Sequence, residues 1–269
     1  MGIIKLLKGI KSNIERYRFN YYKTVVANFK LLPISQAIHF PLIIYGKIEL
    51  KLCNSSIILK TPSKFGLIRW GINQDLFVPS KCHSMLLIIN GKLIINGAIR
   101  VSPGCVFRII NGEVIFGKYN SLGGGSKLLC NNQIYIGDYS RFGFGTILCD
   151  TNFHYINHDG IISNCHGRVR IGKSIFVGNN SSIVKGAVLP DYAIVSSKSY
   201  VNKDFSEYQD GALIAGSPAK VLKSGFKRIS SPLLEQKIKK FFDSHKEDEV
   251  YILSSDDIDN PEDMGVFYS

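Results

Sequence analysis

Every sixth residue between positions 171 and 201 is aliphatic, and this period is the strongest constraint on the fold. The aliphatic positions are Ile171, Val177, Ile183, Leu189, Val195 and Val201, and most of the residues four places further on are small. A six-residue unit cannot bury its own apolar side chain. Three such units can close one triangular coil of a parallel β-helix, and stacked coils then share one core. The period therefore predicts an all-β fold built as a parallel β-helix.

The same spacing recurs upstream in two pairs, Phe116 with Leu122 and Ile136 with Phe142, and glycine follows each of these residues. A β-sandwich would instead alternate apolar and polar residues with period two, with turns every eight to twelve residues or so. We therefore expect the clearest coils over residues 116–205. Residues 33–110 are also rich in short apolar bursts, and we expect them to form early coils that the six-residue rule does not describe.

Flanking segments differ in composition from this region. Residues 1–32 mix Lys, Arg, Tyr and Leu at helical spacing until Pro33, which would stop a helix. This basic segment either caps the domain core or lies on a membrane or a partner. The β-helix domain is expected over residues 33–223, and residues 224–269 are expected to form one amphipathic helix and an acidic tail.

Charge is divided unevenly along the chain. The net charge is +12, but residues 244–269 hold eight Asp and Glu against one Lys, which leaves about +19 on the rest of the chain. We expect the acidic tail to be solvated. The basic residues are scattered and no nucleic-acid motif is present, so an anionic small ligand or a membrane surface is favoured over nucleic acid.

Other sequence patterns indicate the cellular location of the protein and the state of its cysteines. No run of about eighteen apolar residues is present, and the N-terminal residues carry too many charges for a secretory signal. This predicts a cytoplasmic protein, with peripheral contact at the inner membrane face through the basic segment as a further expectation. The six cysteines form no C-x-x-C pair, which favours free, buried thiols.

The stretch "IGKSIFVGNNSSIVKGAVLPDYAIVSSKSYVNKDF", followed by "LIAGSPAKVLK", resembles the closing coils of the hexapeptide-repeat acyltransferases. The resemblance covers residues 110–223 and is closest to the sugar O-acetyltransferases that act on capsule, lipopolysaccharide and exopolysaccharide sugars. It implies a left-handed β-helix, a homotrimer, acetyl-CoA as the donor, a carbohydrate acceptor and an active site between two subunits. The handedness follows from the resemblance alone, because crossover connections are ordinarily right-handed.

The period breaks at "CDTNFHYINHDGIISNCHG", residues 149–167. The separation between Leu148 and Ile171 is not a multiple of six, so we expect a loop over residues 149–170. The resemblance implies that His154, three repeat units after Ile136, is the general base. Transfer of acetyl from a thioester to a hydroxyl needs such a base, and histidine ordinarily serves near pH 7. Asp150 orients the imidazole, holds a sugar hydroxyl, or is a turn residue.

Donor-binding residues are also implied by the resemblance. Those expected at the pantetheine arm and the phosphates of coenzyme A are Asn179, Ser197, Asn202, Lys203, Lys220 and Lys223. Cations at the end of the coils would attract the phosphates of this ligand.

Alternative functions remain open at this point. The spacing of His154, His158 and His166 would also suit a zinc site shared between subunits, as in carbonic-anhydrase-like β-helices. No metal is expected, however, because the coenzyme A pattern would then have no role. An N-acetyltransferase acting on an amino-sugar nucleotide and a non-catalytic β-helical scaffold are the other two alternatives.

Overall fold

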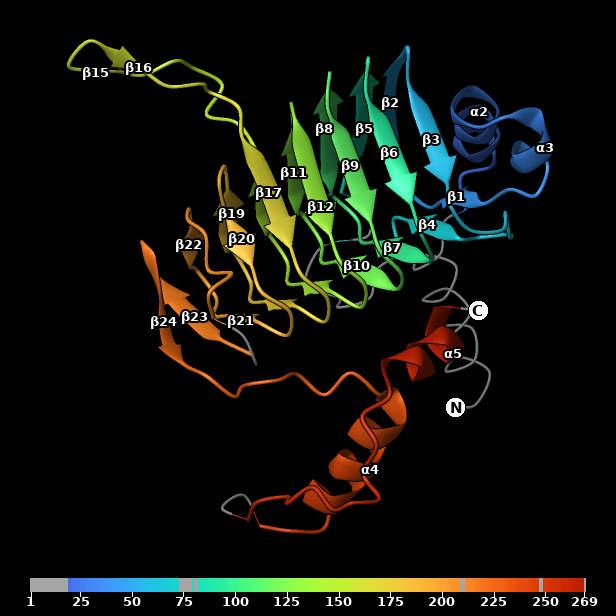
Figure 1. Ribbon diagram of the computed structural model, residues 1–269. Helices are drawn as coiled ribbons and strands as arrows, with labels where there is room; N and C mark the ends of the chain where they lie inside the picture. The colour runs from blue at the N-terminus through green and yellow to red at the C-terminus, as the bar shows by residue number, and fades with distance from the viewer. Residues whose placement is uncertain (1–18, 73–78, 80–81, 209–210, 247–248, 269) are drawn as a thin grey trace.

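The protein is a left-handed parallel β-helix with helices at both ends (Figure 1). The computed structural model describes residues 19–72, 79, 82–208, 211–246 and 249–268. Each coil contributes one strand to each of three sheets, so the body is a triangular prism. The fold class predicted from the six-residue period, and the handedness implied by the resemblance, are both confirmed.

The nine-stranded sheet consists, in spatial order, of β1 (Leu42–Ile44), β4 (Ile68–Trp70), β7 (Ile99–Val101), β10 (Asn120–Leu122), β13 (Arg141–Phe142), β18 (Phe176–Val177), β21 (Ile194–Val195), β23 (Leu213–Gly216) and β24 (Ala219–Lys223). The seven-stranded sheet consists of β2 (Ile48–Cys53), β5 (Ser84–Ile89), β8 (Val106–Ile110), β11 (Lys127–Cys130), β14 (Ile147–Cys149), β19 (Ser182–Val184) and β22 (Tyr200–Val201). The six-stranded sheet consists of β20 (Val188–Leu189), β17 (Arg168–Ile171), β12 (Gln133–Ile136), β9 (Glu113–Phe116), β6 (Lys92–Ile95) and β3 (Ser56–Leu59).

The aliphatic residues of the period fill the core. All six positions from Ile171 to Val201 are at most 2% exposed. Phe176 pairs with Ile194, which makes one coil of three repeat units, whereas Ile99 pairs with Asn120, which makes a coil half a unit longer. The coil that begins at Ile99 is longer because β8 has five residues. The first two coils are longer still, since residues 60–67 connect β3 to β4 and residues 71–83 connect β4 to β5. The six-residue rule therefore fails there through longer strands and long connections, and not through loss of the fold.

The N-terminal helix α2 (Tyr21–Leu31) closes the open end of the first coil. The Asn28 side chain donates to the Leu42 carbonyl oxygen at 2.6 Å and accepts from the Leu42 amide at 3.1 Å. The Thr24 hydroxyl accepts from the Ile44 amide at 3.1 Å. These bonds satisfy the exposed edge of β1, which would otherwise pair with another chain. The described part of the basic segment thus caps the core, and residues 1–18 lie outside the described residues.

Pro33 ends this helix, as predicted. It separates α2 from the short helix α3 (Ile34–Ala37). No helix in the described part of the chain is long and apolar enough to cross a membrane.

The expectation of a solvated acidic tail is wrong for its final residues. After α4 (Pro232–Phe242), the chain returns along the nine-stranded sheet through the 3-10 helix η1 (Pro261–Met264) and α5 (Gly265–Tyr268) (Figure 1). We call residues 257–268 the C-terminal strap. The Asp259 carboxylate accepts from the Ser230 and Ser231 amides at 2.7 and 2.6 Å, and Met264 is fully buried.

Cationic and aromatic side chains of the β-helix hold the strap. The Arg100 guanidinium lies 4.5 Å from the centre of the Tyr268 ring, and Arg141 lies 5.8 Å from it. The Tyr139 hydroxyl donates to the Glu262 carboxylate. The acidic composition that suggested solvation is matched by cations and donors on the outer face of this sheet, and the strap covers that face.

Candidate active site

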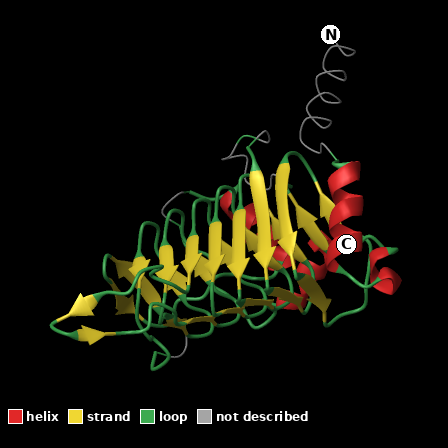
Figure 2. Cartoon of the chain, turned by 90° about the horizontal axis from the view of Figure 1, so that it is seen from above, coloured by secondary structure: helices red, strands yellow, loops and turns green. Residues whose placement is uncertain are grey.

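A long loop interrupts the β-helix between β14 and β17. Ile136 pairs with Ile171, so this coil is almost twice as long as a coil of three repeat units. The loop ends in a hairpin of β15 (Asn157–His158) and β16 (Ile161–Ile162), and both views show it extending away from the prism (Figures 1 and 2). It leaves from the corner between the seven-stranded and six-stranded sheets.

Backbone pairing holds the two arms of the loop together at its base. The Gly167 amide donates to the Asp150 carbonyl oxygen at 2.8 Å, and the Asn152 amide donates to the Cys165 carbonyl oxygen at 2.8 Å. Thr151 and His166 form an antiparallel bridge between these two bonds. The base of the loop is therefore ordered by the same kind of bond as a sheet.

The Asp150 side chain fixes this base to the preceding coil. It is fully buried, and its two carboxylate oxygens accept from the Asn131 and Asn132 amides at 2.8 Å each. The Cys130 thiol donates to one of them at 3.2 Å. Among the three roles left open from the sequence, this geometry favours the turn residue, because both carboxylate oxygens already have donors within the chain.

The three loop histidines occupy three different environments. His154 is exposed, and no hydrogen bond or ion pair connects its side chain to another described residue. His158 lies at the hairpin, with its Nε2 3.9 Å from a carboxylate oxygen of Asp159. His166 is half-buried, and its Nδ1 lies 2.9 Å from the Thr151 hydroxyl. Within the described residues of one chain, no group of three His, Cys, Asp or Glu side chains is placed to hold a metal ion.

Two side chains are positioned at the loop base, and only Arg108 was not singled out from the sequence. His166 is held by Thr151, and Arg108 of β8 lies 5.2 Å from the centre of the Phe153 ring while donating to the Asn131 side chain at 2.7 Å. Arg108 belongs to a coil two turns earlier, so only the coil register brings it beside the residue that precedes His154. No periodic signal in the sequence could have indicated this contact.

The thiols near the loop are buried and protonated. Burial raises the pKa of Cys149, and burial together with the neighbouring Asp150 carboxylate raises the pKa of Cys130 well above its ordinary value. A thiolate is the nucleophilic form of cysteine, so these side chains are poorly suited to carry an acyl group. All six cysteines are free, and four are buried. The prediction of buried thiols is wrong for Cys53, which is exposed at the outer end of β2.

The structure divides the predicted donor-binding residues between two corners. Asn179 and Ser197 follow β18 and β21 on adjacent coils at the corner between the nine-stranded and seven-stranded sheets. A Cβ at Gly178 would lie only 2.4 Å from the Ser197 amide nitrogen, so glycine allows the coils to stack closely here. The Asn179 side chain accepts from the Phe144 amide at 3.1 Å.

The lysines of this set lie at the end of the prism. Lys220 and Lys223 are exposed on the edge strand β24. Lys220 pairs with Ala215 near the corner between the nine-stranded and seven-stranded sheets, where Asn179 and Ser197 also lie. Asn202 and Lys203 follow β22 at the other corner, from which the long loop also leaves, and the Lys203 ammonium lies 5.1 Å from the centre of the Phe205 ring. The structure therefore brings Asn179, Ser197 and Lys220 to one region and places Asn202 and Lys203 apart from them.

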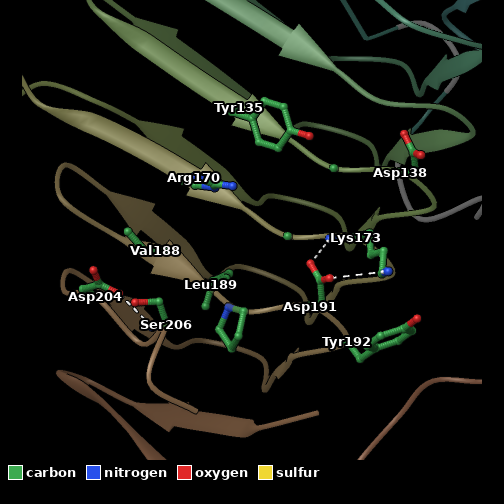
Figure 3. Close-up of a pocket in the computed structure, with 13 residues that line it drawn as sticks. Tyr135, Asp138, Arg170, Lys173, Val188, Leu189, Asp191, Tyr192, Asp204 and Ser206 are labelled. Atoms are coloured by element: carbon green, nitrogen blue, oxygen red, sulfur yellow. Dashed lines mark hydrogen bonds and ion pairs between the residues drawn. The ribbon is translucent and has the colours of Figure 1, made fainter. Parts of the chain in front are cut away.

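A cavity of about 770 Å³ lies on the outer face of the six-stranded sheet, and none of the predicted site residues lines it (Figure 3). Tyr135 and Arg170 line it from neighbouring strands, and the Arg170 guanidinium lies 5.8 Å from the centre of the Tyr135 ring. Lys173 and Asp191 form an ion pair of 3.6 Å at its rim. No local pattern indicates this cavity, because its lining comes from outward positions of β12, β17 and β20, which belong to successive coils.

The fold is that of the hexapeptide-repeat acyltransferases, and comparison with known proteins confirms the resemblance. No family model matches the chain. The polySia-specific acetyltransferase NeuO superposes with a TM-score of 0.54 at 17% identity, covering 79% of this chain and 91% of that one. At this identity the likeness shows the fold alone.

Curated relatives match shorter stretches. Chloramphenicol acetyltransferase of Morganella morganii is 38% identical over 60 residues, which is 22% of this chain and 27% of the relative. Carnitine operon protein CaiE of Salmonella agona is 29% identical over 154 residues, 56% and 66% of the two chains. The putative acetyltransferase YvoF of Bacillus subtilis is 36% identical over 56 residues, 21% and 31%. The matches thus span less than two thirds of the length of each of these relatives.

Proposed function

We propose that this protein is an acyltransferase that moves the acetyl group of acetyl-CoA to a hydroxyl group of a carbohydrate, with His154 as the general base. The observation that carries the proposal is the long loop. It exposes the His154 imidazole, which has no partner among the described residues, close to the point where Asp150 fixes the loop to the preceding coil. The shared fold and the acetyltransferases among the relatives support it.

Direct transfer is the mechanism that these residues suit. The hydroxyl oxygen attacks the thioester carbon, and its proton passes to the imidazole as the new C–O bond forms. The C–S bond then breaks, and the coenzyme A sulfur receives the proton from the imidazolium. No covalent acyl-enzyme is required, and the protonation of Cys130 and Cys149 supports a route without one.

Release of free thiol from acetyl-CoA in a screen of free sugars, nucleotide sugars and amino sugars tests this function. Release with none of them would favour the scaffold alternative. An O-ester product is cleaved by mild base, whereas an N-acetyl product survives, so the same screen decides between the O- and N-acetyltransferase alternatives.

The double variant Lys220→Glu/Lys223→Glu is expected to raise the KM for acetyl-CoA by about tenfold, because both side chains are exposed at the end of the coils and reversing their charge repels the ligand's phosphates. Steady-state kinetics at low salt measure this, and the effect should shrink as salt screens the charges. Lys51→Glu/Lys60→Glu, at the opposite end of the prism, is the matched control. An unchanged donor KM in the first variant would show that these lysines have no part in donor binding.

A homotrimer completes the proposal. Half-buried apolar side chains cover the outer face of the seven-stranded sheet, namely those of Met85, Leu87, Ile89, Val106, Ile110, Leu129, Ile147 and Val184. The strap covers the nine-stranded sheet near β7 and β13, and the seven-stranded sheet has no such cover within the described residues, so its apolar face is well suited to contact a second copy. The loop also exposes Tyr155, Ile156, Ile161 and Ile162, which would be covered by lying on a neighbouring subunit.

Ile110→Glu is therefore expected to convert the trimer to monomers and to remove most of the activity, since a charge would be buried between subunits. Multi-angle light scattering and the thiol-release assay measure both effects. Ile115→Glu is the matched control, because Ile115 is equally half-buried but faces outward on the six-stranded sheet of the same coil. A fully active monomer would rule out a shared site.

A further inference from the structure

The N-terminal cap carries a second apolar side that the β-helix does not cover. Six large side chains on or beside α2 and α3 are between 45% and 76% exposed: Tyr21, Tyr22, Val25, Phe29, Ile34 and Ile38. We call these residues the cap surface. An apolar group of this kind on two consecutive helices marks an interaction site more often than scattered single residues do.

The helix α2 has a buried side against the β-helix and an uncovered apolar side opposite it. Its residues Thr24, Ala27, Asn28 and Leu31 are buried against the first coil. Val25 and Phe29 lie one helical turn apart, so they share the opposite side of the same helix. Capping the core explains only the buried side, and the cap surface needs another explanation.

Charge at the cap is of one sign. The chain contains no Asp or Glu between Glu15 and Glu49, whereas Lys23, Lys30 and Lys47 lie in that stretch. The Lys30 side chain is exposed beside Phe29. Aromatic rings together with lysines are typical of surfaces that enter the interfacial region of a membrane, where anionic headgroups meet the cations. A second copy of the cap would bring its own lysines against these and would be repelled.

We infer that the cap surface docks the protein peripherally on an anionic lipid bilayer. Both views place α2 and α3 at the end of the prism opposite the long loop (Figures 1 and 2). If the protein is the proposed trimer with its axis along the prism, three cap surfaces share one end, and their binding is cooperative through multivalency. The loops then point away from the bilayer.

Flotation with vesicles containing phosphatidylglycerol and phosphatidylcholine tests the inference on the full chain. Wild-type protein is expected to float with these vesicles, to float far less with phosphatidylcholine alone, and to be released by salt. Tyr22→Ser/Phe29→Ser/Ile34→Ser should lower the partition coefficient at least about tenfold, because the variant removes apolar area that enters the interface. These side chains are exposed, so circular dichroism and acetyl transfer to a soluble acceptor should be unchanged.

Ile252→Ser/Leu253→Ser/Ile258→Ser is the matched control, since it removes three exposed apolar side chains from the C-terminal region and should bind vesicles like wild type. Equal flotation of wild type and the cap variant would assign any binding elsewhere and overturn the inference. No flotation of the wild type would overturn it as well, as would a cap variant that instead loses a higher oligomer in light scattering. A failure of the transferase proposal would leave these outcomes unaffected, because the vesicle experiment needs no turnover.

Discussion

His154→Ala is expected to lower kcat by about 10² to 10⁴, which corresponds to about 3 to 5 kcal/mol of activation free energy. The imidazole is exposed and has no hydrogen-bond partner among the described residues, so its loss removes a proton acceptor without disturbing the loop. The donor KM and the oligomeric state should not change. The rate of the parent enzyme should also rise with pH, because a general base must be neutral to accept a proton.

The other two loop histidines are the controls for this prediction. His158→Ala should cost far less, since His158 lies at the far hairpin and is almost fully exposed. His166→Ala removes the contact with Thr151 and should loosen the loop base, which lowers thermal stability together with activity. Normal turnover by the His154 variant would contradict the general-base assignment. Equal need for all three histidines, with zinc found by elemental analysis, would replace it with the metal alternative.

Asp150→Ala is expected to lower the free energy of unfolding by about 3 kcal/mol, because two charge-assisted bonds to the Asn131 and Asn132 amides are lost at a fully buried site. Activity should fall as well, since the first arm of the loop is no longer fixed to the preceding coil. Chemical denaturation and kinetics on the same preparation measure the two effects.

Two further variants decide what the Asp150 carboxylate does. Asp150→Asn keeps an acceptor for one amide and should recover part of the lost stability, whereas Asp159→Ala at the exposed hairpin should leave stability unchanged. If Asp150→Ala were as stable as the parent but had a raised acceptor KM, the carboxylate would be a sugar ligand and not an anchor.

Local spacing was enough to predict the coils. In a β-helix each aliphatic side chain contacts its counterparts one coil away, so a six-residue unit repeated in the sequence is also the unit repeated in space. Val177, Ile183 and Val195 were assigned to the core on this basis, and each is fully buried. The early coils kept the fold while losing the period, because longer strands such as β5, and the connections from β3 to β4 and from β4 to β5, add residues to each coil.

The loop base could not be predicted in the same way. The break in the six-residue period marks where the chain leaves the β-helix. The period carries no information on which residues the two arms of the loop contact. Arg108 reaches Phe153, and Asp150 reaches the turn at Asn131, only because the coil register stacks residues from different turns. The cavity beside Arg170 and the division of the donor-binding residues between two corners arise from the same stacking.

Residue types at short, fixed separations were sufficient to predict a parallel β-helix and the place where it is interrupted. The handedness followed from the family resemblance, and the role of His154 is a proposal. The position of the acidic C-terminal residues and the uncovered face of α2 could be found only in three dimensions. The strap binds where Arg100 and Tyr139 face outward, and the cap surface is uncovered because the first coil can cover one side of a helix only. Both depend on contacts between segments distant in the chain, and no local pattern records such contacts.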